Sequence, residues 1–322
     1  MIILHICAGW QGWNGAANIA RLIMGEQSRE GHEVSSATWA CARQLRSADE
    51  VWIHCSWKPC LWWAALWGRN IHWMPEASYD PIRRRYHGWK KTLVGPIERF
   101  CLRRAKVLVA TCEAEKSWIQ SYLGKHCPPI EVSDIKRFFN LPSVPCSPLP
   151  VARPLHLLYL GRNHPLKGLE YLEAALTTYY NMLSKSPTSN PSPADSNTTY
   201  YNKCPIEFRA VSNASGEELE KVWGWCDVLI LPTLSDNFGL VIAEALERGK
   251  RVITTDGAPA WGPEECGNME MLQISNSNIQ SGSGTWEGYG GRLVYLKGYR
   301  DGTPEVRVHL LKSAIDNLSS HP

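Results

Sequence analysis

Short apolar runs and amphipathic segments alternate along most of the chain. An apolar run over residues 228–231 predicts a buried strand, residues 240–248 predict a helix, and residues 251–254 predict a second strand. Gly249 follows the helix and predicts its end, because glycine tolerates the left-handed conformation common there. Strand, helix and strand form a βαβ unit. Open α/β sheets bind ligands in the loop after such a strand, so this loop is the first candidate site.

Two carboxylates frame the start of the predicted helix. Asp236 precedes the helix, and Glu244 lies one turn inside it. The first N–H groups of a helix lack backbone partners and carry partial positive charge, so a phosphate or a sugar hydroxyl binds well there. The residues expected to offer this binding surface are Asn237, Phe238, Gly239 and Leu240. Asp236 has a simpler alternative role, as an acid that only caps the helix.

A second strand, loop and helix precede this unit by about seventy residues. Residues 156–160 form an apolar run, and residues 169–176 predict a helix. In the loop between them, Gly161 allows close backbone approach to a ligand, while Arg162 and Lys167 supply positive charge for a diphosphate leaving group. A junction with two solvated cations is the simpler interpretation of the same residues.

A glycine-rich turn follows the first predicted strand, residues 1–7. Its glycines stand at positions 9, 12 and 15, which is not the G-x-G-x-x-G spacing of dinucleotide-binding folds, and a helix is predicted over residues 18–28.

The two later loops resemble a known enzyme family. Residues 235–245 read S-D-N-F-G-L-V-I-A-E-A and are similar to the donor-site phrase S-E-N-F-G-x-V-x-x-E-A of retaining glycosyltransferases of family 4, with Asp236 in place of the first Glu. Residues 161–168 resemble the G-R-x-x-x-x-K-G phrase of that family. The resemblance implies a GT-B fold, in which two Rossmann-like, doubly wound α/β domains face a cleft. It also implies that Glu244 binds the nucleotide ribose, Asp236 a hydroxyl of the donor sugar, and Arg162 and Lys167 the diphosphate. In the glycine-rich turn after the first strand, it implies that Gly12 or Gly15 lies near the donor phosphates.

A weaker resemblance lies in the N-terminal half. Residues 75–81 read P-E-A-S-Y-D-P and are similar to the family phrase P-H-G-x-L-D-P, with Glu76 at the usual His and Ala77 at the usual Gly. Glu76 either acts there as a base or as an anchor for an acceptor hydroxyl, or the loop has lost that role. His54, which ends a predicted strand over residues 51–54, is a further candidate, although a histidine in this position is more often structural.

Composition and length agree with two globular domains. The chain has 322 residues, 44% of them hydrophobic, and a proline-dense segment over residues 141–154 predicts the connection between domains. We therefore expect an acceptor-side Rossmann-like domain over residues 1–146 and a nucleotide-sugar domain over residues 147–322. The 11 cysteines are odd in number and show no metal-type spacing, and no Asp-x-Asp pair occurs. We expect reduced thiols, no cofactor and no metal.

Positive charge is concentrated in residues 81–106, which hold nine Lys or Arg and one acid, whereas the whole chain carries a net charge of only +3. Apolar side chains interleave with these cations, a mix that favours an anionic membrane surface or an anionic glycan acceptor. The alternative is an ordinary amphipathic helix with a solvated basic face and a buried stripe over residues 97–102.

The sequence therefore predicts a retaining glycosyltransferase that moves a sugar from a nucleotide-diphosphate donor to a saccharide acceptor, of lipid-linked or lipopolysaccharide type. We expect it in the cytoplasm, with a possible contact to the inner face of the membrane, and with no nucleic-acid partner. Two alternatives stay open: a non-catalytic GT-B carbohydrate-binding protein, and another GT-B enzyme such as a nucleotide-sugar epimerase.

Overall fold

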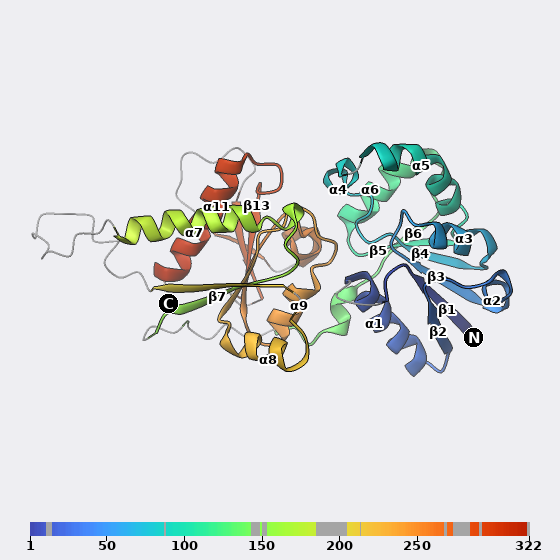
Figure 1. The fold of residues 1–322 in the computed structure, drawn as a ribbon, viewed down its shortest axis with the longest axis horizontal. Coiled ribbons are helices and arrows are strands. Elements are labelled where there is room, and N and C mark those ends of the chain that lie inside the picture. Colours follow the sequence, from blue (N-terminus) through green and yellow to red (C-terminus); the bar gives the residue numbers. More distant parts are fainter. Residues whose placement is uncertain are drawn as a thin grey trace, which may run out of the picture. The chain divides into compact units, whose positions relative to one another are not determined.

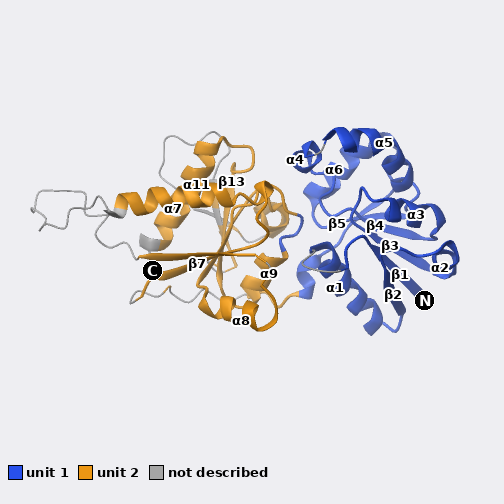
Figure 2. Ribbon diagram, in the orientation of Figure 1, with its two compact units in different colours: residues 1–138, 237–239 blue, residues 139–236, 240–322 orange. Residues whose placement is uncertain are grey.

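The chain folds into two compact α/β units (Figures 1 and 2). The computed structural model describes residues 1–10, 15–86, 88–142, 149, 153–184, 205–212, 214–266, 269–272, 284–289 and 292–320. Residues 1–138 and 237–239 group into unit 1, and residues 139–236 and 240–322 into unit 2. The predicted domain boundary between residues 146 and 147 lies outside the described residues.

Unit 1 is built on a six-stranded parallel sheet in the order β2-β1-β3-β4-β5-β6. Its strands are β1 (Ile2–Cys7), β2 (Glu33–Ala37), β3 (Glu50–His54), β4 (Ile71–Met74), β5 (Val107–Ala110) and β6 (Ile130–Val132). Its helices are α1 (Gly15–Arg29), α2 (Ala42–Ser47), α3 (Pro59–Trp67), α4 (Pro81–Arg85), α5 (Gly88–Leu102) and α6 (Glu113–Leu123).

Unit 2 contains a seven-stranded sheet in the order β11-β12-β13-β10-β9-β7-β8, in which β12 pairs antiparallel with both β11 and β13 and the other neighbours pair parallel. Its strands are β7 (Leu155–Leu160), β8 (Ile206–Val211), β9 (Val228–Leu231), β10 (Arg251–Thr255), β11 (Glu270–Leu272), β12 (Gly284–Gly288) and β13 (Leu293–Lys297). Its helices are α7 (Leu169–Ser184), α8 (Gly216–Trp225), α9 (Leu240–Glu247), α10 (Pro263–Cys266) and α11 (Pro304–Ser320), and α11 packs against α7 (Figure 1).

The sequence pattern explains these elements directly. All four residues of β9 are buried, as expected for a parallel strand that is covered on both faces. In α7 the buried residues Leu172, Ala175, Leu176 and Tyr179 recur at helical spacing and form one apolar face. Gly249 has a φ of 70°, which confirms the predicted end of the helix in this βαβ unit.

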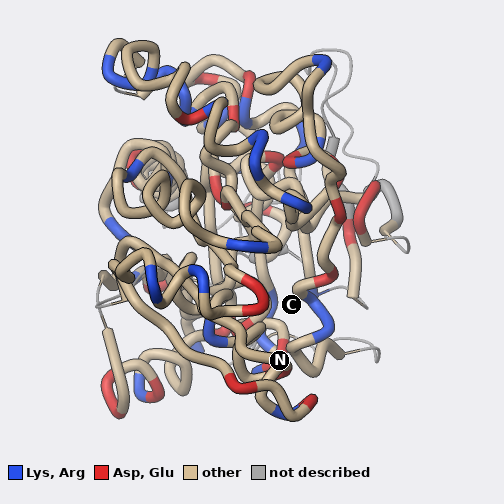
Figure 3. Tube along the Cα trace, turned by 90° about the vertical axis from the view of Figure 1, so that its right-hand side faces the viewer, with Lys and Arg blue, Asp and Glu red and all other residues tan. Residues whose placement is uncertain are grey.

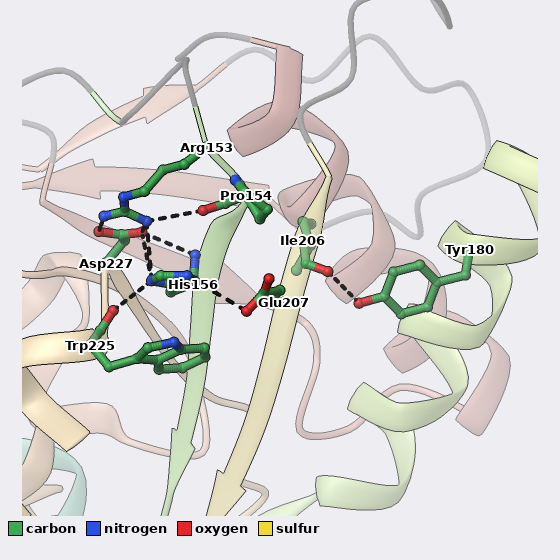
Figure 4. A network of polar contacts seen from close by, with 8 residues as sticks. All are labelled: Arg153, Pro154, His156, Tyr180, Ile206, Glu207, Trp225 and Asp227. Carbon is green, nitrogen blue, oxygen red and sulfur yellow. Dashed lines mark hydrogen bonds and ion pairs between the residues drawn. The ribbon is translucent and has the colours of Figure 1, made fainter. Parts of the chain in front are cut away.

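A polar clamp fixes the amino ends of β7 and β9 in unit 2 (Figure 4). The Arg153 guanidinium donates two 2.7 Å hydrogen bonds to the Asp227 carboxylate, and the His156 backbone N–H donates a third bond of 3.0 Å. Burial alone would raise the pKa of Asp227, but these donors outweigh it and lower the pKa. The clamp lies at the end of the sheet opposite the predicted ligand loops, so we assign it a structural role.

The basic segment forms α4 and α5, and the structure corrects one expectation about it. The buried residues of α5 are Gly95, Glu98, Cys101 and Leu102. Ile97 and Phe100, which the amphipathic alternative placed in a buried stripe, are 50% and 57% exposed. This helix carries apolar residues on two sides, so periodicity alone did not identify the buried one. Among the described residues, no helix has the length and apolar character needed to cross a membrane.

Candidate active site

Strand order identifies the ligand-binding edge of each sheet. In unit 2 the first strand, β7, lies between β8 and β9, and in unit 1 the first strand, β1, lies between β2 and β3. The connections on either side of such a strand run in opposite directions and leave a crevice at the carboxyl ends of the strands. In unit 2 the two loops beside this point follow β7 and β9, and they contain the two sequence motifs.

The loop after β7 places Lys167 through a sharp turn. Residues Pro165–Lys167 form a short 3-10 turn, and Gly168 follows with a φ of 66°. A Cβ atom at Gly168 would lie 2.0 Å from the Pro232 carbonyl oxygen, so the lysine must be followed by glycine here. Gly161 begins the loop, and its N–H donates to the Val211 carbonyl at 3.0 Å. The Arg162 side chain is exposed, and it forms no ion pair with another described residue.

Three loops are joined by hydrogen bonds into one structure. The Leu166 carbonyl accepts from the Thr233 hydroxyl at 3.0 Å, from the Leu234 N–H at 2.8 Å and from the Ser235 N–H at 3.4 Å. The Asp236 N–H donates to the Gly257 carbonyl at 2.7 Å and so ties in the loop after β10. The positions of the two motifs therefore depend on each other.

Lys167 and Asp236 meet at this junction. The Lys167 ammonium and the Asp236 carboxylate form an ion pair, and their side chains are 14% and 18% exposed. A half-buried pair is screened less by water than a surface pair, so its electrostatic interactions are stronger. The pair sets a cation and an acceptor side by side, which suits a ligand that carries both a phosphate and a hydroxyl.

Helix α9 continues from the second loop. Leu240 is its first residue, and Gly239 precedes it with a φ of 68°. Asn237, Phe238 and Gly239 group with unit 1 by their contacts, and Phe238 and Gly239 are buried. Glu244 is half-buried on α9, and its burial raises the pKa of its carboxyl, with Arg248 acting in the opposite direction. No metal-binding cluster of three or more His, Cys, Asp or Glu occurs within the described part of the chain.

The structure places Glu76 of unit 1 at the end of a buried row of polar side chains. His54 Nδ1 lies 3.3 Å from Glu76 Oε1, and His54 Nε2 lies 3.0 Å from His5 Nδ1. His5 Nε2 lies 2.8 Å from Gln27 Oε1. The two histidines are completely buried and Glu76 is 5% exposed. Glu76 and Ala77 both have positive φ, 57° and 55°, a left-handed conformation that is uncommon for residues other than glycine.

The row has a defined direction. Burial lowers the pKa of His5 to about 4 and also lowers that of His54, so both rings are neutral near pH 7. Gln27 Oε1 can only accept, so His5 donates to it through Nε2 and accepts at Nδ1. His54 therefore donates to His5 through Nε2 and accepts at its own Nδ1, which faces Glu76. The remaining donor is the Glu76 carboxyl, whose pKa is raised by burial, then by Cys7 and Glu115. This arrangement favours the protonated acid at Glu76.

Sequence analysis identified Glu76 and His54 separately but missed the other members of this row. His5 lies in the middle of an apolar strand, and Gln27 lies on a helix, so neither position carried a signal. Cys7 and Cys55 were also missed; their thiols hydrogen-bond to each other, which lowers the pKa of Cys7 to about 7. Gly15 begins α1, three residues earlier than the predicted helix, while Gly12 lies outside the described residues.

The fold is similar to several solved glycosyltransferases, although no protein-family model and no curated protein matches the sequence. The lipopolysaccharide outer core galactosyltransferase WaaB has a TM-score of 0.55 and 13% identity, over 100% of this chain and 92% of WaaB. Sucrose-phosphate synthase from Thermosynechococcus elongatus has a TM-score of 0.54 and 15% identity, over 82% and 84%. HepE from Anabaena, solved with UDP-glucose, has a TM-score of 0.53 and 13% identity, over 99% and 92%. Together with the parallel sheet of unit 1 and the mostly parallel sheet of unit 2, these similarities confirm that the chain has the GT-B fold.

Proposed function

We propose that this protein is a retaining glycosyltransferase that moves a sugar from a nucleotide diphosphate to a saccharide acceptor. The observation that carries the proposal is the Lys167–Asp236 pair at the strand-order reversal of the second sheet, beside the exposed Arg162. The similarly folded HepE was solved with UDP-glucose, and WaaB is a galactosyltransferase of the lipopolysaccharide outer core; both support a nucleotide-sugar donor.

In the proposed reaction, the bond between the sugar and the diphosphate oxygen breaks, and the nucleoside diphosphate leaves next to Lys167 and Arg162 with one more negative charge than the bound donor carried. These cations stabilise the charge that develops on the leaving group, a role worth about two to three orders of magnitude for a single donor. The acceptor hydroxyl attacks from the face on which the diphosphate departs, and the diphosphate takes its proton. Asp236 accepts a hydrogen bond from a donor-sugar hydroxyl. The raised pKa of Glu76 supports a hydroxyl-anchoring role for this residue better than a role as a base.

Hydrolysis of a panel of UDP-, GDP- and ADP-sugars tests the proposal most directly. Glycosyltransferases without acceptor transfer the sugar slowly to water, so one donor should release its nucleoside diphosphate above background. A carbohydrate-binding protein would release none, and an epimerase would convert the sugar without releasing it. Either of these outcomes would replace the transferase proposal.

We expect substitutions of Glu244 and Asp236 to affect the binding of different ligands. Glu244→Gln should weaken the binding of free nucleotide and of nucleotide sugar alike, by about tenfold. The reason is that hydrogen bonds to a charged acceptor are worth about 1.5–3 kcal/mol. Asp236→Asn should leave free nucleotide binding within about twofold and weaken only the sugar-bearing donor. Calorimetric titration of both variants measures this, with Glu247→Gln, an exposed acid on the same helix, as the matched control. Equal losses of free nucleotide in both variants would show that the assigned roles are wrong.

We propose that the protein acts at an anionic membrane surface, which it contacts through α5. Trp89, Leu93, Ile97 and Phe100 are 71%, 74%, 50% and 57% exposed and recur at helical spacing on one side of α5. Nine Lys or Arg lie along residues 81–106, and this combination binds anionic headgroups and the acyl boundary together. Figure 3 shows the Lys and Arg positions of the whole described chain in blue.

We therefore expect Trp89→Ser/Leu93→Ser to lower co-sedimentation with phosphatidylglycerol vesicles by about tenfold or more, since burying each large apolar side chain is worth about 1.5–3 kcal/mol. Val132→Ser/Met182→Ser removes two exposed apolar residues elsewhere and should have little effect. Unchanged binding of the α5 variant, or equal binding of the wild type to neutral vesicles, would contradict the membrane proposal.

A further inference from the structure

A cavity of about 500 Å³ lies in unit 1, where α4, α5 and α6 meet the segment that contains Trp57. Four cations line it, and no carboxylate does. The lining residues that matter here are Arg84, Arg85, Lys91, Arg99, Trp57 and Tyr122. None of the residues that line this cavity belongs to the Glu76 row, and the proposed transfer reaction does not use these cations.

Nearby acids offset the positive charge of the cavity only in part. None of its four cations forms an ion pair with a carboxylate of the described residues. The nearby acid Glu98 is fully buried and accepts hydrogen bonds from the Tyr79 hydroxyl at 2.5 Å, the Trp57 N–H at 3.3 Å and the Trp62 indole. Partial burial lowers the pKa of Lys91, the positive charges of Arg83 and Arg84 lower it further, and the Asp80 carboxylate acts in the opposite direction.

Hydrogen bonds and contacts with the Tyr122 ring hold three of the cations in place. Lys91 Nζ donates to the Arg83 carbonyl at 2.5 Å, and Arg99 Nε donates to the Tyr122 carbonyl at 3.2 Å. The Arg84 and Arg99 guanidinium carbons lie 4.8 and 4.5 Å from the centroid of the Tyr122 ring. Side chains that are already ordered lose less conformational entropy when a ligand binds, so this cluster is better prepared for an anion than scattered surface lysines are.

We propose that this cavity binds a phosphate ester. Planar guanidinium groups match phosphate oxygens in pairs, so Arg84 and Arg99 would hold the phosphate, with Lys91 supplying a further charge. The volume lies within the range of small-molecule sites and leaves room for a ring attached to the phosphate, against the indole of Trp57. The assignment of this ester as the acceptor rests on the proposed transferase function; the binding itself does not.

Calorimetric titration with inorganic phosphate tests the site. We expect Arg84→Gln/Arg99→Gln to bind phosphate at least about tenfold more weakly than the wild type, because two charge-assisted contacts are lost. The matched control is Lys90→Gln/Lys106→Gln, which removes the same charge from exposed positions of the same segment and should stay within about twofold. Equal weakening in both variants, or none in the cavity variant, would overturn the proposal.

A second variant keeps the test decisive if loss of the arginines disturbs the packing of Tyr122. Thr92 is exposed at the cavity, so Thr92→Glu adds a carboxylate there without removing a packed side chain. It should also weaken phosphate binding by about tenfold through repulsion and partial neutralisation. Phosphate binding that is unchanged in a folded Thr92→Glu protein would count against the site.

Two further arms distinguish the source of the phosphate. Vesicles of phosphatidylcholine with phosphatidic acid present it as a lipid headgroup, and glucose 6-phosphate presents it in solution. Vesicle binding that depends on Arg84 and Arg99, and that inorganic phosphate displaces, identifies a lipid source. If glucose 6-phosphate binding depends on Arg84 and Arg99 and vesicle binding does not, the source is a soluble phosphate ester. If neither kind of binding depends on these arginines, the proposal is overturned. Nucleotide-sugar hydrolysis by the wild type tests the transferase function separately, so either proposal can fail alone.

Discussion

Lys167→Ala should reduce turnover of the donor by about a hundredfold or more. The lysine supplies positive charge at the point where the leaving diphosphate develops negative charge, and removing one such stabiliser costs about two to three orders of magnitude in rate. The loss should appear in kcat at saturating donor as well as in kcat/KM. Lys167→Arg keeps the charge and should recover part of the rate. Lys221→Ala removes an exposed lysine from α8 and should change nothing.

A purely structural role for Lys167 makes a different prediction. If the lysine only neutralises Asp236, then Lys167→Ala/Asp236→Asn should restore both stability and turnover. In the proposed mechanism the double variant regains stability but stays slow. Near-normal turnover of Lys167→Ala at saturating and subsaturating donor would overturn the assignment.

Gly168→Ala should be the most destabilising single substitution in the loop after β7. Its Cβ atom would lie 2.0 Å from the Pro232 carbonyl oxygen, in a backbone conformation with a φ of 66° that L-residues adopt at a cost. We expect a loss of about 4 kcal/mol or more, which belongs to the rare class of severe single substitutions. For a unit of this size that corresponds to a fall in Tm of about 10 °C or more.

Gly249→Ala is the matched control for this prediction. Gly249 has a φ of 70°, but no atom lies within 4 Å of the Cβ position, so the variant carries the backbone strain without the overlap. It should lose only about 1 kcal/mol. Thermal unfolding of both variants, with and without nucleotide, measures the effect of each substitution on stability. Gly249→Ala gives the cost of the backbone strain, and the difference between the two variants gives the cost of the overlap. Similar losses of stability in both variants would show that the close approach of Gly168 to Pro232 does not determine the effect of Gly168→Ala.

The sequence predicted local features well because local forces determine them. The buried strand β9, the start of α9 at Leu240 and the turn at Gly249 follow from an apolar run, helical spacing and a glycine. The GT-B fold was expected from the resemblance of the two loops to the family phrases. Arg162, Lys167, Asp236 and Glu244 were identified as site residues by those phrases, and their assigned roles stay predictions.

Features that depend on distant parts of the chain could not be predicted. The contact between Lys167 and Asp236 depends on β7 and β9 being neighbours, which is a property of strand order. The row from Gln27 to Glu76 joins a helix, two strands and a loop, so no spacing in the sequence reveals it. The alternative interpretation of α5, which buried Ile97 and Phe100, was wrong because both sides of this helix carry apolar residues.

The carbonyl of Leu166 has a consequence for how this protein can be re-engineered. Since three donors from the loop after β9 converge on this one oxygen, the loops after β7 and β9 behave as a single module. A chimaera that imports residues 161–168 alone from a similarly folded enzyme should express poorly. A chimaera that imports residues 161–168 and 232–239 together should fold and carry over the donor preference of its source. Expression yield and donor profiles of the two chimaeras would measure this interdependence.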